Sequence, residues 1–265
     1  MLLYYVALPL VLLSLILFSI IPTLARPFDR SARVYHWAWH AWSRLTMVLF
    51  RIRLSVRGRQ RADGEGNRIY IVNHGSYIDI PVLGAALTDR AVFVYKEELQ
   101  RTPVWGPLLR LSPHIAISRT EGREAFETIE QTARRIREGD LSVVIFPEGT
   151  RSADGSLGEF RRGGFLLATR TGVPIVPVAI RGTQRLLPRD DWRVRPGEVE
   201  VVIGEPIDVP LGLTRPQEKA IQQRTWDALA AMLETGATAP DSVGAADVER
   251  AADTGSAAGA GHAAE

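Results

Sequence analysis

The sequence predicts an α/β domain, preceded by an N-terminal membrane-associated helix pair and followed by an acidic tail. Three observations lead to this prediction: an uncharged apolar run opens the chain, short Val- and Ile-rich runs alternate with helical patterns in its middle, and large apolar residues become rare near its end. Strands that alternate with helices are typical of α/β folds. We therefore divide the 265 residues into a membrane helix pair (1–50), an α/β domain (51–234) and a disordered tail (235–265).

The composition excludes several classes of protein. The absence of cysteine excludes a disulfide scaffold, a Cys-ligated zinc site, an iron–sulfur cluster and a thiol nucleophile. The formal charge of +2 is uneven, because the tail carries −4 and leaves +6 on residues 1–234. A basic body suits an anionic partner such as a phospholipid headgroup or a phosphate substrate. Nucleic acid is not an expected partner, because aromatic residues are not interleaved with a basic patch.

The first 25 residues contain no charged side chain, and about 20 apolar residues suffice to span a bilayer. A cleaved signal peptide would have basic residues before a shorter apolar run, so we favour a retained membrane segment. Arg26, Arg30 and Arg33 follow the run. By the positive-inside rule, the protein is expected at the cell membrane with the α/β domain on the cytoplasmic face.

Residues 31–50 predict a second helix, whose tryptophans Trp37, Trp39 and Trp42 are expected at the level of the lipid headgroups. His36 and His40 are one helical turn apart, as in a metal-binding pair. No third ligand lies nearby in the sequence, so we favour interfacial side chains. A basic stretch that suits anionic lipid follows, at Arg51, Arg53, Arg57, Arg59 and Arg61.

The rest of the α/β domain is expected to contain six strands, at 68–72, 91–95, 114–118, 141–146, 175–180 and 199–203. Helices are expected between Thr120 and Gly139, where apolar residues repeat at helical spacing, and at 163–170 and 217–233. Pro174 and Pro177 lie in or beside the fifth strand and predict an edge or irregular position for it.

The first candidate site follows strand 68–72 and reads Asn73-His74-Gly75-Ser76-Tyr77-Ile78-Asp79. The spacing keeps His74 and Asp79 off one helical face, so they meet only if His74 lies on the loop and Asp79 in the first turn of the next helix, with Ser76 as its N-cap. Such a pair can perform general-base catalysis, because the carboxylate fixes the imidazole tautomer and the imidazole deprotonates a hydroxyl. A capping box of Ser76 and Asp79, without catalytic role, is the alternative.

The second candidate site follows strand 141–146 and reads Pro147-Glu148-Gly149-Thr150-Arg151-Ser152. Arg151 can hold a phosphate bidentately, and Thr150 or backbone N–H groups can add to it. Arg119, after the third strand, would add a second cation at the same rim of the sheet. The alternative is an ordinary turn with a solvated arginine. Together the two sites, on a membrane-associated domain, predict a hydroxyl-bearing, phosphorylated lipid as substrate.

These motifs also carry a resemblance to a known family. Asn73-His74-x4-Asp79, Phe146 to Ser152, and Val173-Pro174-Ile175-Val176-Pro177-Val178 resemble three of the four ordered motifs of the glycerolipid acyltransferases, in particular the bacterial 1-acyl-sn-glycerol-3-phosphate (lysophosphatidate) acyltransferases. The resemblance covers residues 57–206. The remaining motif, the second of the four in order, departs from the family pattern, because Ser118 stands where an aspartate often precedes the arginine, here Arg119. The resemblance implies a mixed sheet flanked by helices, with the N-terminal helix pair in the membrane, where it either spans the bilayer or lies in one leaflet.

The resemblance implies an O-acyltransferase that moves a fatty acyl group from acyl-CoA or acyl carrier protein to the free sn-2 hydroxyl of lysophosphatidate, giving phosphatidate for phospholipid synthesis. His74 is then the general base, and Asp79 orients it and stabilises its imidazolium. The acceptor's phosphate and glycerol are bound by Arg119, Glu148, Gly149, Thr150 and Arg151, with Glu148 contacting a hydroxyl or an arginine. No metal and no cofactor are expected, since the acyl thioester is a co-substrate. The expected partners are a lysophospholipid acceptor, the acyl donor and anionic membrane lipid.

Three alternatives remain. The first is the same transfer to glycerol-3-phosphate, a lyso-ornithine lipid or another lysophospholipid. The second is a lipid hydrolase with Ser76 as nucleophile, although the sequence around Ser76 has no G-x-S-x-G pattern. The third is a lipid-binding protein without catalysis.

Overall fold

The computed structural model describes residues 2–25, 27–29, 32–62, 66–103, 105–117, 123–138, 141–152 and 154–235. Arg119 and residues 236–265 of the predicted disordered tail lie outside these ranges. The helices are α1 (Leu2–Ala25), α2 (Arg33–Leu49), α3 (Asp79–Ala86), α4 (Trp105–Leu111), α5 (Arg123–Glu138), α6 (Gly163–Thr171), α7 (Thr183–Leu186) and α8 (Arg215–Thr235), and 3₁₀ turns span Arg59–Arg61 and Glu97–Arg101. The strands are β1 (Ile52–Arg57), β2 (Ile69–Val72), β3 (Ala91–Lys96), β4 (Ile115–Ile117), β5 (Ser142–Ile145), β6 (Ile175–Arg181) and β7 (Gly197–Ile203).

The seven strands form one mixed sheet in the order β1-β7-β6-β2-β5-β3-β4, which confirms the predicted fold class. The five strands from β6 to β4 run parallel, so their carboxyl ends meet at one rim. At the other side of the sheet β7 is antiparallel to β6, and β1 is parallel to β7. The two candidate motifs follow β2 and β5, which are neighbours, and this places both motifs at the shared rim.

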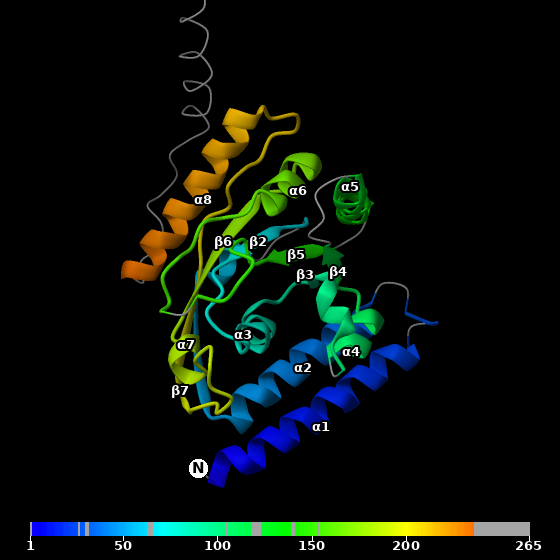
Figure 1. Cartoon of the computed structure of the whole chain (residues 1–265), viewed down its shortest axis with the longest axis vertical. Helices are drawn as coiled ribbons and strands as arrows, with labels where there is room; N and C mark the ends of the chain where they lie inside the picture. Colours follow the sequence, from blue (N-terminus) through cyan, green and yellow to red (C-terminus); the bar gives the residue numbers. More distant parts are fainter. Residues whose placement is uncertain are drawn as a thin grey trace, which may run out of the picture.

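Helices cover both faces of the sheet (Figure 1). Successive side chains of strand β2 point to opposite faces of the sheet and therefore enter two different cores. Tyr70 and Val72 belong to the core that contains residues of α2 and α3. Ile69 and Ile71 belong to the core that contains residues of α5, α6 and α8. All four side chains are fully buried, as expected for a central strand of a parallel sheet.

Helix α1 is long and apolar enough to cross a membrane, by length and composition, over Tyr4–Ala25. It forms a pair with α2: the Phe18 and Trp37 rings lie 6.0 Å apart, and Trp42 Nε1 donates to the Val11 carbonyl at 3.4 Å. Its other face exposes large apolar side chains, among them Tyr5, Leu10, Leu13, Leu17 and Leu24. The predicted helix pair is therefore present, and its exposed apolar face is consistent with membrane association.

The predicted interfacial position is wrong for two side chains of α2. Trp39 is buried and meets Phe93 edge-on at 5.4 Å, and His36 is only 3% exposed. The cause is the close packing of α2 on α3 at Gly84, where a Cβ atom would come within 2.1 Å of Ser43 Oγ. His40 is also engaged there, because its Nδ1 donates to the Gly84 carbonyl at 2.7 Å.

The basic stretch after α2 includes an edge strand of the sheet. In β1 the apolar Ile52, Leu54 and Val56 alternate with polar residues, and the strand pairs with β7. Arg53 pairs with Glu198 at 2.7 Å and Arg57 with Glu200 at 2.8 Å, while Arg61 pairs with Glu205. Carboxylates of β7 and of the residues after it thus pair with three of the arginines that we expected to bind anionic lipid, and Glu200 is shared with Arg181. The lipid contact of this stretch stays a prediction.

The prediction of an edge position for the proline-containing strand is also wrong, because β6 lies between β7 and β2. Pro174 precedes the strand, and Pro177 accepts a hydrogen bond from Gly204 N–H at 2.8 Å, just beyond the end of β7. The ladder between β6 and β7 begins at the next residue, Val178. The missing proline N–H therefore falls at the end of the ladder and costs no bond within it.

Candidate active site

The loop after β2 brings His74 and Asp79 together. Asp79 is the first residue of α3, and its Oδ2 accepts hydrogen bonds from His74 Nδ1 at 2.8 Å and from the N–H groups of Gly75 and Ser76, both at 2.9 Å. A carboxylate only accepts, so Nδ1 carries the ring proton and Nε2 keeps its lone pair. The Asp79 side chain is 1% exposed and that of His74 is 16% exposed. The geometry is that of an oriented base within reach of a substrate, and the same carboxylate also makes the backbone contact of a capping box.

Ser76 does not act as the predicted N-cap of α3. Its Oγ donates to the Leu187 carbonyl at 2.8 Å and accepts from Ile78 N–H only at 3.4 Å, and the residue is fully buried. The hydroxyl thus ties the loop after β2 to the segment after α7. A buried hydroxyl bonded to a carbonyl is also poorly placed to be a hydrolase nucleophile.

Glu148 joins the loop after β5 to the loop after β2. Its Oε1 accepts from His74 N–H and its Oε2 from Gly158 N–H, both at 3.0 Å. Ser152 N–H donates to the His74 carbonyl at 2.8 Å, so the backbone N–H and C=O of His74 are both bonded to the loop after β5. Burial raises the pKa of Glu148, against the opposing effect of the two backbone hydrogen bonds. The contacts observed for Glu148 are thus with backbone N–H groups, and no arginine pairs with it among the described residues. Its contact with an acceptor hydroxyl stays a prediction.

An aromatic layer supports the imidazole. Phe146, the residue that directly follows β5, stacks on the His74 ring with centroids 4.1 Å apart and planes 19° apart. Phe93 stacks in turn on Phe146 at 6.1 Å. Behind Phe93 lies His114, whose Nε2 is 2.9 Å from the Tyr35 hydroxyl and whose pKa is lowered to about 3 by burial. The base therefore has an apolar wall on one face.

Arg151 lies at the rim of the site and has no acidic partner in the part of the chain that the structure describes. Its guanidinium carbon lies 3.8 Å from the centroid of the Tyr77 ring. Its Nη1 donates to the Arg189 carbonyl at 3.3 Å, and Arg189 donates back to the Arg151 carbonyl at 3.4 Å. These contacts fix the position of the cation without neutralising its charge, so the side chain can still pair with an anion.

The turn between Glu148 and Arg151 requires a glycine. Gly149 has a φ of +70°, and a Cβ atom there would come within 2.9 Å of Arg161 Nε. Thr150 is exposed and contributes to a hollow of about 250 Å³, which is also lined by Glu148, Ser152, Asp154, Ser156, Gly158 and Glu159. Hydroxyls and carboxylates dominate this hollow, so it suits a hydroxyl-bearing ligand better than a phosphate.

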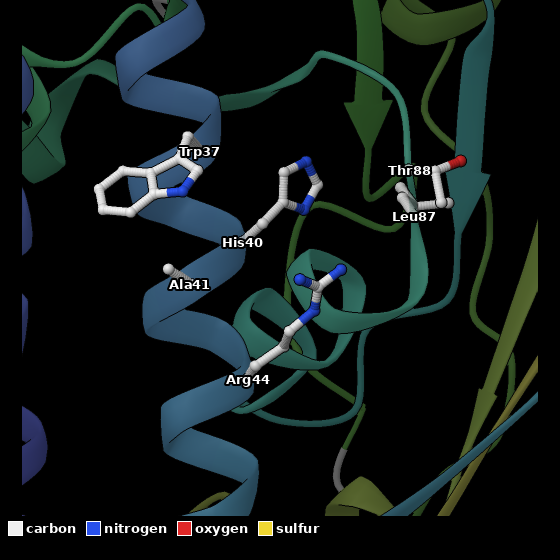
Figure 2. A pocket seen from close by; sticks show the side chains of 6 residues that line it. All are labelled: Trp37, His40, Ala41, Arg44, Leu87 and Thr88. Carbon is white, nitrogen blue, oxygen red and sulfur yellow. The ribbon is translucent and has the colours of Figure 1, made fainter.

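A second hollow, of about 210 Å³, lies on the flank of α2 (Figure 2). In it His40 and Arg44 of α2 face Leu87 and Thr88, which follow α3. It contains no residue of the His74 or Arg151 loops, so it is separate from the candidate active site. Among the described residues no group of three or more His, Asp or Glu side chains could hold a metal ion.

The site thus brings together His74, Asp79, Glu148, Gly149, Thr150 and Arg151, while Arg119 lies outside the described residues. The sequence analysis missed the supporting residues Tyr77, Phe146 and Arg189. Tyr77 and Phe146 lie inside or next to the motifs, and their aromatic character was the available signal. Arg189 is 38 residues from Arg151, and nothing in the sequence indicates that contact.

Comparison with known proteins confirms the resemblance. The family model described as Acyltransferase matches residues 53–181. A 1-acyl-sn-glycerol-3-phosphate acyltransferase of Escherichia coli is 33% identical over 170 residues, which is 64% of this chain and 68% of that protein. One of Cocos nucifera is 33% identical over 168 residues, 63% of this chain, and this chain spans only about half of that relative, 54%.

The fold has a counterpart among solved structures. The crystal structure of the 1-acyl-sn-glycerophosphate (LPA) acyltransferase PlsC from Thermotoga maritima superimposes with a TM-score of 0.67 and 24% identity. The match covers 87% of this chain and 97% of that one.

Proposed function

Because the chain belongs to the acyltransferase family, we propose that it transfers a fatty acyl group from acyl-CoA or acyl carrier protein to the sn-2 hydroxyl of lysophosphatidate, giving phosphatidate. One observation carries the proposal: an oriented His74–Asp79 pair lies beside a loop that presents an arginine without an acidic partner in the described residues. A base and a cation at one rim suit an acceptor that has a hydroxyl and a phosphate.

In the proposed reaction, His74 Nε2 removes the proton from the acceptor hydroxyl while the oxygen attacks the thioester carbonyl. The tetrahedral intermediate then collapses, the carbon–sulfur bond breaks, and the imidazolium returns the proton to the departing sulfur. Asp79 stabilises the imidazolium through the bond to Nδ1. The oxygen–carbon bond of the ester replaces the carbon–sulfur bond of the thioester, so no metal, cofactor or covalent enzyme intermediate is needed.

Arg151 is the proposed ligand of the acceptor's phosphate, and the hollow beside Thr150 is the proposed place of its glycerol. The carboxylates of the hollow would repel a phosphate, whereas Arg151 would attract it. Arg119 is proposed as a second cation. Glycerol-3-phosphate, a lyso-ornithine lipid and other lysophospholipids are the alternative acceptors of the same transfer.

We place the proposed reaction at the cytoplasmic face of the cell membrane. The exposed apolar face of α1 supports membrane association, and the arginines that follow α1 in the sequence favour the cytoplasmic side. There the lipid acceptor and the soluble thioester donor meet.

The test is acyl transfer from radiolabelled acyl-CoA to lysophosphatidate in membranes that contain wild type or His74→Ala. We expect phosphatidate from wild type and a loss of about a hundredfold to ten-thousandfold in the variant. If neither protein forms product, acyl carrier protein thioesters and the alternative acceptors distinguish a wrong substrate from a wrong reaction. Equal activity of both proteins above a blank without enzyme contradicts the mechanism.

A further inference from the structure

The segment Leu187–Pro196, between α7 and β7, contacts both the loop after β2 and helix α1. Leu187 accepts the hydrogen bond from Ser76 Oγ, and the Trp192 carbonyl accepts one from the Tyr4 hydroxyl at 2.8 Å. Figure 1 shows this yellow segment close to the N-terminal end of α1. One short segment thus connects the position of the active site with that of the apolar helix.

The side chains of this segment are of the kinds that favour the surface of an anionic bilayer. Trp192 is 74% exposed, although its ring stacks at 6.2 Å on Tyr77, which is itself 48% exposed. An exposed indole beside a phenol is unfavourable in water and favourable at the headgroup level, where ring and polar N–H are both accommodated.

The charges around Trp192 also suit anionic lipid. The segment contains three exposed arginines, Arg189, Arg193 and Arg195, and two aspartates. Asp191 is shared between Arg193 at 3.2 Å and Arg195 at 3.0 Å, so one carboxylate faces two guanidinium groups. With Arg151, which is bonded to Arg189, the surface has four arginines and two aspartates, a net charge of +2. Asp191 in this respect resembles Glu200, which is shared between Arg57 and Arg181, and differs from Glu198, which pairs with Arg53 of β1.

The surface is continuous with the apolar face of α1. Tyr4, which bonds to Trp192, is followed by Tyr5, which is 60% exposed, and the exposed face continues to Leu13 and Leu24. A bilayer that covers this face of α1 therefore reaches Trp192 at the start of the helix. A soluble protein partner would need to cover the apolar helix and the charged segment together.

We propose that Leu187–Pro196 is a second membrane-contact element, in which Trp192 enters the headgroup layer of an anionic bilayer and the neighbouring arginines bind lipid phosphates. This contact holds the rim with Tyr77 and Arg151 against the lipid surface. A phospholipid acceptor then moves from the bilayer to His74 without passing through bulk water. This last consequence rests on the proposed function, whereas the membrane contact itself does not.

The absence of cysteine among the 265 residues allows a direct test in this chain. Trp192→Cys is labelled with an environment-sensitive fluorophore, and the protein is reconstituted in phosphatidylcholine vesicles with and without phosphatidylglycerol. Quenching is measured with lipids that have a nitroxide at the headgroup or deep in the acyl chain. Leu13→Cys, on the exposed face of α1, is the membrane reference, and Lys219→Cys, on the exposed side of α8, is the aqueous reference.

We expect the label at position 192 to be quenched by headgroup nitroxides more strongly than by deep ones, and more strongly when phosphatidylglycerol is present. The double variant Arg193→Glu, Arg195→Glu, made with the same label, should lose the dependence on phosphatidylglycerol. If the label at position 192 behaves as at position 219 while position 13 is quenched, the segment does not contact the membrane and the proposal is wrong. Acyl transfer is not needed for this readout, so a failure of the proposed function leaves the test unaffected.

Discussion

The two loops at the carboxyl ends of β2 and β5 are fixed in different ways. In the first, Asp79 has a 1% exposed side chain and binds three donors of its own loop. In the second, Glu148 is bonded back to the first loop, whereas Thr150 is exposed. Within the described residues, the Arg151 guanidinium contacts a ring face and a carbonyl but no carboxylate. The donors of the first loop thus converge on Asp79 Oδ2 inside the protein, where the buried Oδ1 has no hydrogen-bond partner among the described residues, whereas Arg151 of the second loop is left for a ligand.

The difference matches two chemical tasks. A general base must be held in one tautomer and one orientation before the substrate arrives, because reorganisation during the reaction adds to the barrier. A side chain that binds phosphate must keep its positive charge unpaired until the phosphate arrives. The predictions below test this division, beginning with the first loop.

The largest effect is expected from Asp79→Asn. An asparagine amide can donate to His74 Nδ1, which favours the tautomer with the proton on Nε2 and removes the lone pair that the reaction needs. We expect kcat for acyl transfer to fall by about a hundredfold to ten-thousandfold, with a small change in KM.

The control for this variant is Asp208→Asn, an exposed aspartate after β7. Thermal unfolding of both variants by circular dichroism separates catalysis from stability, because Asp79 also binds the N–H groups of Gly75 and Ser76. A folded Asp79→Asn protein with wild-type kcat contradicts the assignment of the base.

A smaller effect, on a different parameter, is expected from Arg151→Ala. The loss of one charge-assisted contact should raise KM for lysophosphatidate about tenfold to a hundredfold and leave kcat within a few-fold. Arg185→Ala, an exposed arginine of α7, is the matched control. With an acceptor that has no phosphate, Arg151→Ala and wild type should have the same KM. If KM rises equally for both acceptors, Arg151 does not bind the phosphate.

Glu148→Gln tests the link between the loops. The glutamine amide cannot accept both N–H groups that Glu148 accepts, so either His74 or Gly158 loses a partner, and we expect kcat to fall about tenfold. Glu159→Gln, an exposed neighbour in the same hollow, should have no such effect.

The same variant has a pH signature. The raised pKa means that the folded protein binds a proton at Glu148 more readily than the unfolded chain, whose ordinary value is 4.5. The stabilising contribution of this proton is therefore present below pH 4.5 and is lost as pH rises through the raised pKa. We expect the difference in unfolding free energy between wild type and Glu148→Gln, measured in urea, to decrease from pH 4.5 upward. A difference independent of pH contradicts the buried state of this carboxyl.

The sequence predicted what depends on near neighbours in the chain. His74 and Asp79 are five residues apart, so a strand end followed by a helix start was enough to bring them together. The strands β2 to β7 were found because apolar runs of strand length are a local signal. In β1 the same signal was present as an alternation of apolar and polar residues, but its arginines were interpreted as a lipid contact.

What the sequence could not predict depends on residues far apart in the chain. The carboxylates that pair with the arginines of β1 are more than 140 residues away, and the α2–α3 contact that buries Trp39 depends on Gly84. The central position of β6 is likewise possible because β7 ends at Ile203, so that Pro177, which has no N–H, lies just outside the β6–β7 ladder. The division into three parts and the catalytic roles of the site residues stay predictions.

The smallest effect is expected from Tyr77→Leu, which removes the ring below Arg151. An exposed cation–π contact is worth about 0.5–1 kcal/mol, so KM for lysophosphatidate should rise about twofold to fivefold. Tyr77→Phe keeps the ring face and should behave as wild type. If the second loop depended on rigid internal contacts like the first, Tyr77→Leu would lower kcat as Asp79→Asn does. A change confined to KM therefore indicates that the His74 base is held rigidly, whereas the phosphate-binding Arg151 is positioned by weak contacts.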